Sequence, residues 1–224
     1  MPSKSGRALL FDIDGTLADT DALHIQAFNH VFGPYGHVFD RARASKELLG
    51  FSNTALAARF LPDETLERRA AIMAEKEAAF RELAPGQIHP LSGLLALFAL
   101  ADRAGTPIVA VTNAPRENAD MMLSALEIAD RFAAVIIGDE LAHGKPHPLP
   151  YLEGLRAVGA VPELSVAFED SRSGIRAAVA AGIATIGIRT SLAHADMIAE
   201  GAVMTSDHFD DPDLIRYVAT AMGW

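Results

Sequence analysis

The 224-residue sequence contains no cysteine, few basic side chains and no long hydrophobic run. The absence of cysteine excludes disulfides and thiolate chemistry. Nineteen Lys and Arg against 29 Asp and Glu give a formal charge of −10, so the chain lacks the basic footprint of nucleic-acid-binding proteins. Its apolar runs are far too short to cross a bilayer, so we expect neither a nucleic-acid nor a membrane partner.

The first residues do not have the pattern of a secretory signal. Lys4 and Arg7 precede the apolar residues 8–11, which Asp12 interrupts before they reach the length of a signal-peptide core. We therefore expect a cytoplasmic protein. Half of the residues are hydrophobic, which is enough to form a large core without covalent cross-links.

Five short apolar segments, each followed by polar residues, indicate buried strands. They are residues 7–11, 107–112, 133–137, 165–168 and 184–188. Segments with helical periodicity lie between them, as at residues 119–126 and 175–182. Continuous apolar strands that alternate with helices predict a doubly wound α/β domain with a parallel sheet, a Rossmann-like core. Such sheets bind ligands at the carboxyl ends of their strands.

Residues 18–84 interrupt this alternation, because they contain no convincing strand and favour helix throughout. One helix is expected over residues 63–83, with Asp63 as its N-cap. The segment is too long for a crossover between two strands. We predict a small helical cap domain, residues 18–84, inserted into a core formed by residues 1–17 and 85–224.

Asp12 and Asp14 follow the first predicted strand, and their spacing of two would point both carboxylates to one side of an extended backbone. One carboxylate can attack phosphorus to form an aspartyl-phosphate, while the other protonates the leaving oxygen and later deprotonates a water. Gly15 permits a sharp turn, which Thr16 can cap. The alternative is a solvated Asp-Gly turn.

Glu169 and Asp170 follow the fourth predicted strand. Alone, they are also typical of a helix N-terminus, with Asp170 or Ser171 as the N-cap. Together with Asp12 and Asp14 they place four carboxylates at adjacent strand ends, where they would repel one another unless a cation lay among them. Mg²⁺ suits such an oxygen-rich site.

Thr112, Asn113 and Lys145 are candidate partners for a phosphate. Thr112 and Asn113 follow the second strand, where a hydroxyl and backbone N–H groups at a helix start can bind phosphate oxygens, although such residues often only cap a helix. Lys145 lies in a turn of Gly and Pro residues, so it could pair with Asp12 and with phosphoryl oxygens. A solvated lysine is the alternative.

These motifs resemble, in their order, those of the haloacid dehalogenase superfamily, and specifically its branch of small-cap phosphatases and sugar-phosphate mutases. The resemblance covers nearly the whole chain and rests on residues 11–17, 111–113, 144–146 and 168–178. It implies that Asp12 is the nucleophile and Asp14 the acid/base. Dehalogenases of this superfamily typically have Tyr at the position of Asp14, so the resemblance points to phosphate esters.

The resemblance also implies the ligands of a Mg²⁺ ion: the Asp12 carboxylate, the Asp14 backbone carbonyl and Asp170. Glu169 would be a neighbour of the ion or an occasional direct ligand. Thr112, the Asn113 backbone and Lys145 would then hold the transferring phosphoryl group.

The cap residues depart from the branch in part. Within residues 50–53, Asn53 stands where related phosphoglucomutases carry an Arg that grips a second phosphate. His24 and Lys76 match positions that face the substrate, although an ordinary helix residue and a solvated helix face are their respective alternatives. Leu149 replaces the usual Asp after Lys-Pro-x-Pro, which leaves the support of the Lys145 loop in question.

We therefore predict a Mg²⁺-dependent phosphomonoesterase that acts on a small phosphorylated metabolite, with no prediction of oligomeric state. Two alternatives remain. One is a sugar-phosphate mutase similar to β-phosphoglucomutase, which Asn53 disfavours. The other is a non-enzymatic phospho-acceptor module similar to a response-regulator receiver, which would need only about half this length and no cap.

Overall fold

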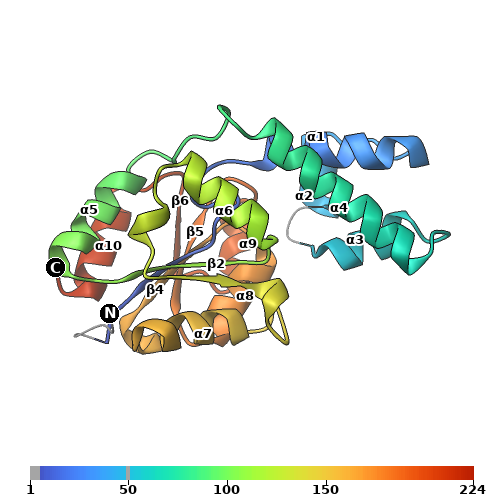
Figure 1. Ribbon diagram of the computed structural model, residues 1–224. Coiled ribbons are helices and arrows are strands. Elements are labelled where there is room, and N and C mark those ends of the chain that lie inside the picture. Colours follow the sequence, from blue (N-terminus) through green and yellow to red (C-terminus); the bar gives the residue numbers. More distant parts are fainter. Residues whose placement is uncertain (1–5, 49–50) are drawn as a thin grey trace. The chain divides into compact units, whose positions relative to one another are not determined.

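The computed structural model describes residues 6–48 and 51–224, and these form two compact units (Figure 1). Unit 1 comprises Met1–Asp19 and His89–Trp224, and unit 2 comprises Thr20–Ile88. Lys4 and Gly50, which entered the sequence analysis, lie outside the described residues. Unit 2 corresponds closely to the predicted segment 18–84, while its action as a cap stays a prediction.

Unit 1 contains a six-stranded parallel sheet in the order β3-β2-β1-β4-β5-β6. The predicted fold class is therefore confirmed. The strands are β1 (Leu9–Phe11), β2 (Ile108–Thr112), β3 (Ala134–Ile137), β4 (Val166–Glu169), β5 (Ala184–Ile188) and β6 (Met204–Ser206). β6 was not predicted from the sequence, because its three residues are too few to show a period and two of them are polar.

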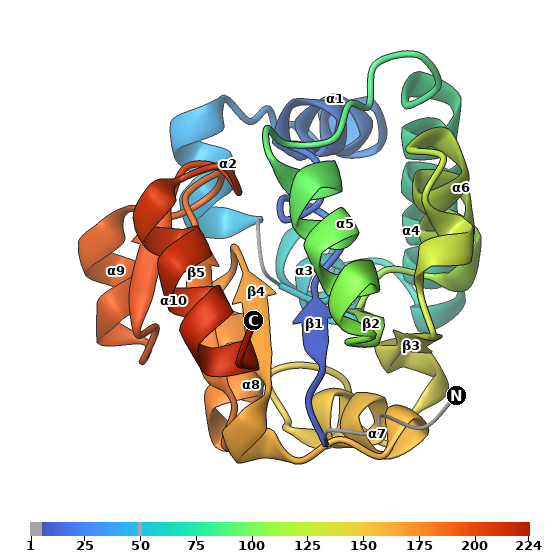
Figure 2. The same cartoon turned by 90° about the vertical axis from the view of Figure 1, so that its left-hand side faces the viewer.

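Helices cover both faces of this sheet. They are α5 (Leu94–Ala104), α6 (Arg116–Ala125), α7 (Leu149–Val158), α8 (Arg172–Ala180), α9 (His194–Ala199) and α10 (Pro212–Met222), with short 3₁₀ turns η2 (Ala129–Arg131), η3 (Gly138–Glu140) and η4 (Pro162–Leu164). Figure 2 looks onto the face that α5 and α10 cover. There the Phe11 ring stacks on Phe168, with ring centroids 4.4 Å apart, and meets Phe98 of α5 edge-on. On the other face, Leu10 and Val109 pack against α7 and α8.

Two helix predictions need correction. The helix expected over residues 175–182 ends at Ala180, because Gly182 adopts a left-handed conformation with φ of +80° that ends the helical path. No helix opens directly after Asn113 either, since α6 begins at Arg116.

β1 lies at the point where the strand order reverses. Its neighbours are β2 on one side and β4 on the other, and the Asp12 N–H donates to the Phe168 carbonyl at 3.0 Å. The chain passes from β1 outward through β2 and β3, and then returns to β4. The crevice at such a reversal is where parallel α/β sheets bind ligands. Asp12 follows β1 and Glu169 ends β4, so both lie at this crevice.

The described residues of unit 2 contain helices and no strand, as predicted. The helices are α1 (Asp21–Phe32), α2 (Arg41–Glu47), α3 (Asn53–Phe60) and α4 (Leu66–Leu83), with a 3₁₀ turn η1 (Gly33–Tyr35). Aromatic and aliphatic side chains from all four helices form one buried cluster, which includes Phe28, Ala44, Phe60 and Ile72. Unit 2 therefore has a hydrophobic core of its own.

The predicted N-cap of the long helix in unit 2 is wrong. α4 begins at Leu66, and the Thr65 hydroxyl accepts a hydrogen bond from the Arg68 N–H at 3.2 Å. Asp63 lies in a turn two residues before this N-cap. The helix is otherwise the one expected.

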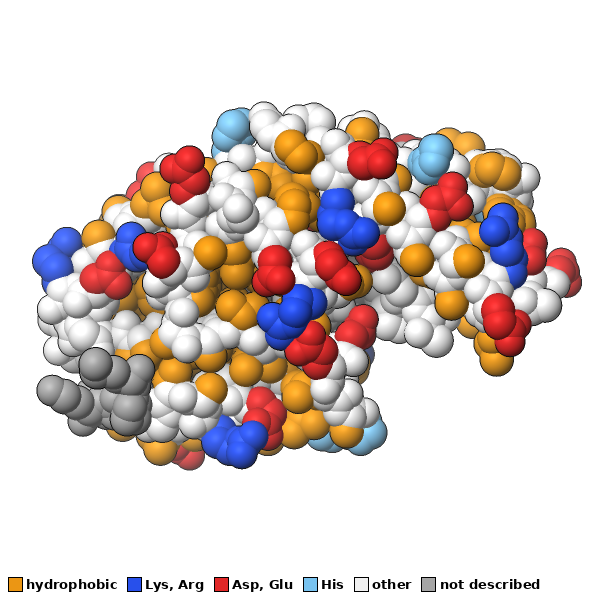
Figure 3. Space-filling view, in the orientation of Figure 1, with side chains coloured by type: hydrophobic (Ala, Val, Ile, Leu, Met, Phe, Trp, Pro, Cys, Tyr) orange, Lys and Arg blue, Asp and Glu red, His pale blue; other side chains and the backbone are white. Residues whose placement is uncertain are grey.

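The surface mixes charges of both signs. On the face shown in Figure 3, Lys and Arg side chains are interspersed with Asp and Glu rather than gathered into one basic patch. Exposed cations are often paired, as Arg116 is with Glu140 at 2.6 Å. Among the described residues, no helix is long and apolar enough to cross a membrane.

Candidate active site

A buried lysine joins two carboxylates at the crevice of unit 1. Lys145 Nζ donates to Asp12 Oδ1 and to Glu169 Oε1, at 2.6 Å each, and to the Val111 carbonyl at 2.7 Å. Asp12 and Lys145 are 7% exposed, and Glu169 is fully buried. The contacts form because β1, β2 and β4 are neighbours whose carboxyl ends share one edge of the sheet. The solvated alternatives for Asp12 and Lys145 are thus excluded.

Burial dominates the electrostatics of this pair. It raises the pKa of Asp12, Lys145 lowers it, and Glu169 and Asp14 raise it again, to about 7. Burial by itself would lower the pKa of Lys145, but the attraction of Asp12 and Glu169 outweighs it and raises that pKa above its usual value. Lys145 therefore stays protonated at neutral pH as a fixed positive charge beside Asp12.

Three carboxylates gather at this point. Asp12, Glu169 and Asp170 are all buried and offer oxygen atoms that lie within 4.8 Å of one another. With the Lys145 ammonium they carry a formal charge of −2. The Asp14 carboxylate is half-buried and does not belong to this group. Asp14 thus remains a candidate metal ligand only through its backbone carbonyl, the atom that the resemblance implies.

The loop after β1 is a tight turn, as predicted. The Gly15 N–H donates to the Ala18 carbonyl at 2.9 Å, and Gly15 has a φ of +76°. A Cβ at Gly15 would lie 2.1 Å from Asp170 Oδ2, so no larger residue fits there. The expectation that Thr16 caps the turn is wrong: its buried hydroxyl has no hydrogen-bond partner among the described residues, because backbone bonds close the turn without it.

Asn113 supports the Lys145 loop through its side chain. Asn113 Oδ1 accepts from the Lys145 N–H at 2.9 Å, and Asn113 Nδ2 donates to the Lys145 carbonyl at 3.0 Å. A Cβ at Gly138 or Gly144 would come within 2.2 Å or 2.7 Å of Asn113 Oδ1, so both glycines make room for this amide. These contacts hold the loop in the absence of an Asp at Leu149.

Thr112 makes a local contact. Its hydroxyl accepts a hydrogen bond from the Ala114 N–H at 2.9 Å, within the turn that precedes α6. The part that Thr112 and the Asn113 backbone play in holding a phosphoryl group stays a prediction.

Tyr151, which was not predicted, and Gly174, which belongs to the motif 168–178, both lie against Glu169. The Tyr151 hydroxyl, buried on α7, donates to Glu169 Oε1 at 2.6 Å. Burial, followed by the charges of Glu169 and Asp12, raises the pKa of Tyr151 well above its usual value. A Cβ at Gly174 would lie 1.9 Å from Glu169 Oε2. Nothing in the sequence distinguishes Tyr151 from an ordinary core aromatic residue.

The segment after β5 contributes two further residues that were missed. The Ser191 hydroxyl donates to Asp170 Oδ2 at 2.5 Å, and the Thr190 hydroxyl donates to the Gly15 carbonyl at 2.5 Å. The sequence contains a signal for them, because they are polar residues within three positions of the end of a predicted strand, as Asp12 and Asp170 are. Of Asp170 and Ser171, the two expected N-caps of α8, Ser171 is the one found, since its hydroxyl accepts from the Gly174 N–H at 3.0 Å.

Unit 2 has a separate polar cluster that contains both predicted substrate-selecting residues. Lys76 is 3% exposed, so the solvated-face alternative is wrong. Its Nζ lies 3.1 Å from His24 Nδ1 and 3.0 Å from Glu77 Oε1, and Asn53 Nδ2 donates to the same Glu77 oxygen at 2.7 Å. The His24 ring stacks on Phe80, with ring centroids 4.0 Å apart. The polar cluster of unit 2 therefore links α1, α3 and α4.

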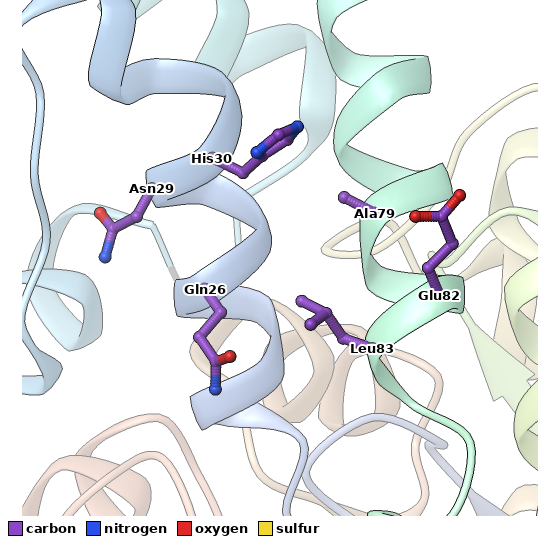
Figure 4. A pocket seen from close by; sticks show the side chains of 6 residues that line it. All are labelled: Gln26, Asn29, His30, Ala79, Glu82 and Leu83. Atoms are coloured by element: carbon purple, nitrogen blue, oxygen red, sulfur yellow. The ribbon is translucent and has the colours of Figure 1, made fainter.

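A groove of about 620 Å³ also lies in unit 2, between α1 and α4 (Figure 4). Asn29, one of the residues that line it, already bonds through its side chain to the backbone of Phe39. None of the predicted site residues lines the groove, and we assign it no chemistry. Its lining consists of Gln26, Asn29, His30, Ala79, Glu82 and Leu83.

Residues 9–188 match the sequence profile of the haloacid dehalogenase-like hydrolases. The chain belongs to this family. Both the predicted superfamily and the prediction of a hydrolytic enzyme are thereby confirmed. The match spans the loops that carry the carboxylates and Lys145.

Relatives of this haloacid dehalogenase-like hydrolase cover most of its length. The protein CbbY of Cupriavidus necator is 33% identical over 221 residues, which are 92% of this chain and 87% of the relative. A phosphorylated carbohydrates phosphatase of Thermotoga maritima is 30% identical over 203 residues, 88% and 92% of the two chains. A crystal structure of a CbbY variant from Rhodobacter sphaeroides in complex with xylulose-(1,5)bisphosphate has a TM-score of 0.79 and 32% identity, and covers 91% of this chain and 95% of the other.

Haloacid dehalogenase-like hydrolases generally use a divalent metal ion, and the residues present fit one. The buried group of Asp12, Glu169 and Asp170 supplies carboxylate oxygens, which hard divalent cations prefer. The formal charge of −2 that remains beside Lys145 shows that the protein alone does not neutralise this group.

Proposed function

We propose that this hydrolase removes phosphate from a small phosphorylated sugar or related metabolite, with Mg²⁺ as its cofactor and Asp12 as its nucleophile. The observation that carries the proposal is the buried contact of Asp12 with Lys145, beside Glu169 and Asp170. The named relatives support the substrate class, since one is a phosphatase of phosphorylated carbohydrates and another was crystallised with a sugar bisphosphate.

In the first displacement, an Asp12 carboxylate oxygen attacks phosphorus, and the bond between phosphorus and the ester oxygen breaks. Asp14 gives its proton to the departing alkoxide, which leaves as an alcohol. The Lys145 ammonium, next to Asp12, stabilises negative charge on the transferring phosphoryl oxygens together with Thr112 and the Asn113 backbone. The product on the enzyme is an aspartyl-phosphate at Asp12.

In the second displacement, Asp14 takes a proton from a water molecule that attacks the same phosphorus. The bond between phosphorus and the Asp12 oxygen breaks, inorganic phosphate leaves, and the Asp12 carboxylate is restored. Asp14 is again protonated and ready for the next ester. The two carboxylates therefore divide the work of nucleophile and proton carrier.

The residues that would hold Mg²⁺ are the Asp12 and Asp170 carboxylates and the Asp14 backbone carbonyl, with Glu169 as their neighbour. When bound, the ion would neutralise negative charge on Asp12 and on the phosphoryl group. Glu169 shares its Oε1 between Lys145 and Tyr151, which supports a role beside the ion more than a role as its ligand.

The test is phosphate release from a panel of phosphorylated metabolites, including phosphoglycolate, hexose phosphates and deoxyhexose phosphates. Turnover should need Mg²⁺, stop with a chelator, and fall by more than about a thousandfold in Asp12→Asn. The matched control is Asp120→Asn, which changes an exposed aspartate of α6 and should leave the rate unchanged. Appreciable activity in purified Asp12→Asn would refute the mechanism.

We further propose that His24 and Lys76 of unit 2 select the substrate by contact with its leaving group. Lys76 offers a buried ammonium and His24 a ring nitrogen beside it, which suits the hydroxyl groups of a sugar phosphate. Replacement of either by Ala should change the ranking of substrates, measured as kcat/KM across the panel. An unchanged ranking in both variants would show that His24 and Lys76 do not select the substrate.

A sugar-phosphate mutase is the second candidate, because the chain has a resemblance to that branch. The Asn53 amide bonds to Glu77 and brings no positive charge for a second phosphate, which disfavours it. Isomerisation of a hexose 1-phosphate without phosphate release, followed by ³¹P NMR, would favour the mutase.

Membership of a hydrolase family disfavours the receiver-like module. A phosphorylated form of the protein with a lifetime of many minutes would favour it. The cytoplasmic location and the absence of a nucleic-acid partner stay predictions.

A further inference from the structure

Two hydroxyl side chains after β5 contact both loops that carry the proposed metal ligands. Ser191 reaches the Asp170 carboxylate, and Thr190 reaches the backbone carbonyl of Gly15, a residue 175 positions away in the sequence. The contacts are possible because β5 pairs with β4, whose carboxyl end leads into Asp170. A single two-residue segment thus contacts the loop after β1 and the loop after β4.

The Asp170 carboxylate is closely surrounded on this side. Ser191 donates to its Oδ2 at 2.5 Å, a bond from a hydroxyl to a buried carboxylate. The Gly15 backbone lies against the same oxygen, since a Cβ there would be only 2.1 Å away. Together, the hydroxyl and the glycine limit rotation of this carboxylate.

The segment is itself anchored to the edge of the sheet. The Arg189 guanidinium donates to both carboxylate oxygens of Asp207, at 2.8 Å and 2.7 Å, and to the Thr205 hydroxyl at 2.9 Å. The Arg189 N–H also donates to the Ser206 carbonyl at 2.8 Å. Arg189 therefore fixes the start of this segment to β6 through bonds that do not involve the acidic loops.

We propose that Thr190 and Ser191, which we call the β5 clamp, are positioning residues for the divalent cation. Ser191 orients the Asp170 carboxylate, and Thr190 holds the loop after β1 at a fixed separation from it. The proposal rests on the proposed function, in which Asp170 and the loop after β1 bind the ion. Hydrogen bonds that orient ligating carboxylates typically change metal affinity by about ten- to a hundredfold.

The experiment measures binding of Mn²⁺ and Mg²⁺ to the full-length protein without substrate, by electron paramagnetic resonance and by calorimetry. Ser191→Ala should bind either ion about tenfold or more weakly than the wild type. Ser191→Thr, which keeps the hydroxyl, should bind nearly as the wild type does. The control is Ser92→Ala, which removes a similar hydroxyl–carboxylate bond, to Asp210 at 2.6 Å, outside the acidic group, and should change nothing.

A second measurement separates positioning from a general structural defect. The phosphatase rate of Ser191→Ala should recover to within a few-fold of the wild type when the Mg²⁺ concentration is raised, because the weakened step is binding of the ion. Thr190→Val should show a loss of affinity in the same direction. Should Ser191→Ala fail to fold, Ser191→Thr and Ser191→Val give the same comparison, since they differ by a hydroxyl.

The outcomes distinguish the clamp from the proposed function. Equal cation affinity in the wild type and Ser191→Ala would overturn the clamp and leave the phosphatase intact. A rate that stays low at saturating Mg²⁺ would also overturn it. A wild-type protein that binds neither ion would instead overturn the metal assignment of the proposed function, and with it the clamp.

Discussion

The two units each bury a lysine beside carboxylates, but they balance its charge differently. In unit 1, Lys145 contacts both Asp12 and Glu169, with Asp170 close by, and the group keeps a formal charge of −2. In unit 2, Lys76 contacts the single carboxylate of Glu77, and the pair is neutral. The first group lies at strand ends, whereas the second is built on helix faces.

This difference indicates what each cluster can do. A buried surplus of negative charge is costly, so the unit 1 cluster is suited to bind a cation. The bound cation would in turn favour binding of the anionic phosphoryl group. The Lys76–Glu77 pair of unit 2 is already neutral, so it offers directed hydrogen bonds without the need for a counter-ion. The charges therefore favour catalysis in unit 1 and substrate selection in unit 2.

The largest expected effect comes from removal of each lysine. Lys145→Met leaves three buried carboxylates without their cation and should lower the free energy of unfolding by about 3–5 kcal/mol in a metal-free buffer. Phosphate release should fall by at least about a thousandfold. Lys76→Met leaves one carboxylate that keeps the Asn53 amide, so both losses should be smaller. Urea unfolding and activity assays check this, and equal losses in the two variants would contradict the comparison.

Much of the unit 1 cluster could be predicted because its residues obey a rule of position. Asp12 and Asp170 follow buried apolar strands, and parallel strands bring their carboxyl ends together. The same rule applies to Ser191, but a lone hydroxyl after a strand has no charge to mark it. The role of Tyr151 could not be predicted from the sequence, because its hydrogen-bond partner depends on how α7 packs on the sheet. The Asn113 amide shows the same limit, since its contact with the Lys145 loop depends on two distant glycines.

The polar cluster of unit 2 was less predictable for a physical reason. Lys76 lies on a helix rich in charged residues, where a solvated position is the ordinary outcome. Its burial depends on α1 packing against α4, which places His24 beside it. Helical periodicity in the sequence predicts the helices but not which of their faces meet.

Replacement of Gly174 by Ala tests how tightly the unit 1 cluster is packed. Gly174→Ala places a Cβ 1.9 Å from Glu169 Oε2, so the buried carboxylate or α8 must move. We expect a loss of about 2–4 kcal/mol in the free energy of unfolding, although Ala favours helix over Gly. Gly33→Ala is the control, because a Cβ there meets nothing within 4 Å. A Gly174→Ala protein as stable as the wild type would show that Glu169 has more room than its contacts imply.

Removal of the Tyr151 hydroxyl tests how firmly Glu169 holds Lys145. Tyr151→Phe removes one of the two donors to Glu169 Oε1 and leaves the ring in place. We expect the free energy of unfolding to fall by about 1.5–3 kcal/mol, since the lost bond is to a charged group. The value of kcat should fall by about tenfold with little change in KM, because Lys145 is held less firmly in the transition state. A change in KM alone would show that Tyr151 acts on substrate binding and not on Lys145.

The smallest expected effect is in unit 2 and depends on pH. Burial raises the pKa of Glu77, but Lys76, the Asn53 amide and His24 outweigh it and hold that pKa below its ordinary value of 4.5. As the pH falls, the unfolded chain therefore takes up the proton first, so the stability from this carboxylate is present above its ordinary pKa and is lost below it. Glu77→Gln should lower the free energy of unfolding by about 1 kcal/mol at neutral pH and lessen the decline below about pH 5. The control is Glu82→Gln, an exposed position on the same helix. If urea unfolding across this pH range gives parallel curves for Glu77→Gln and the wild type, the neutral pair does not stabilise unit 2 through its charge.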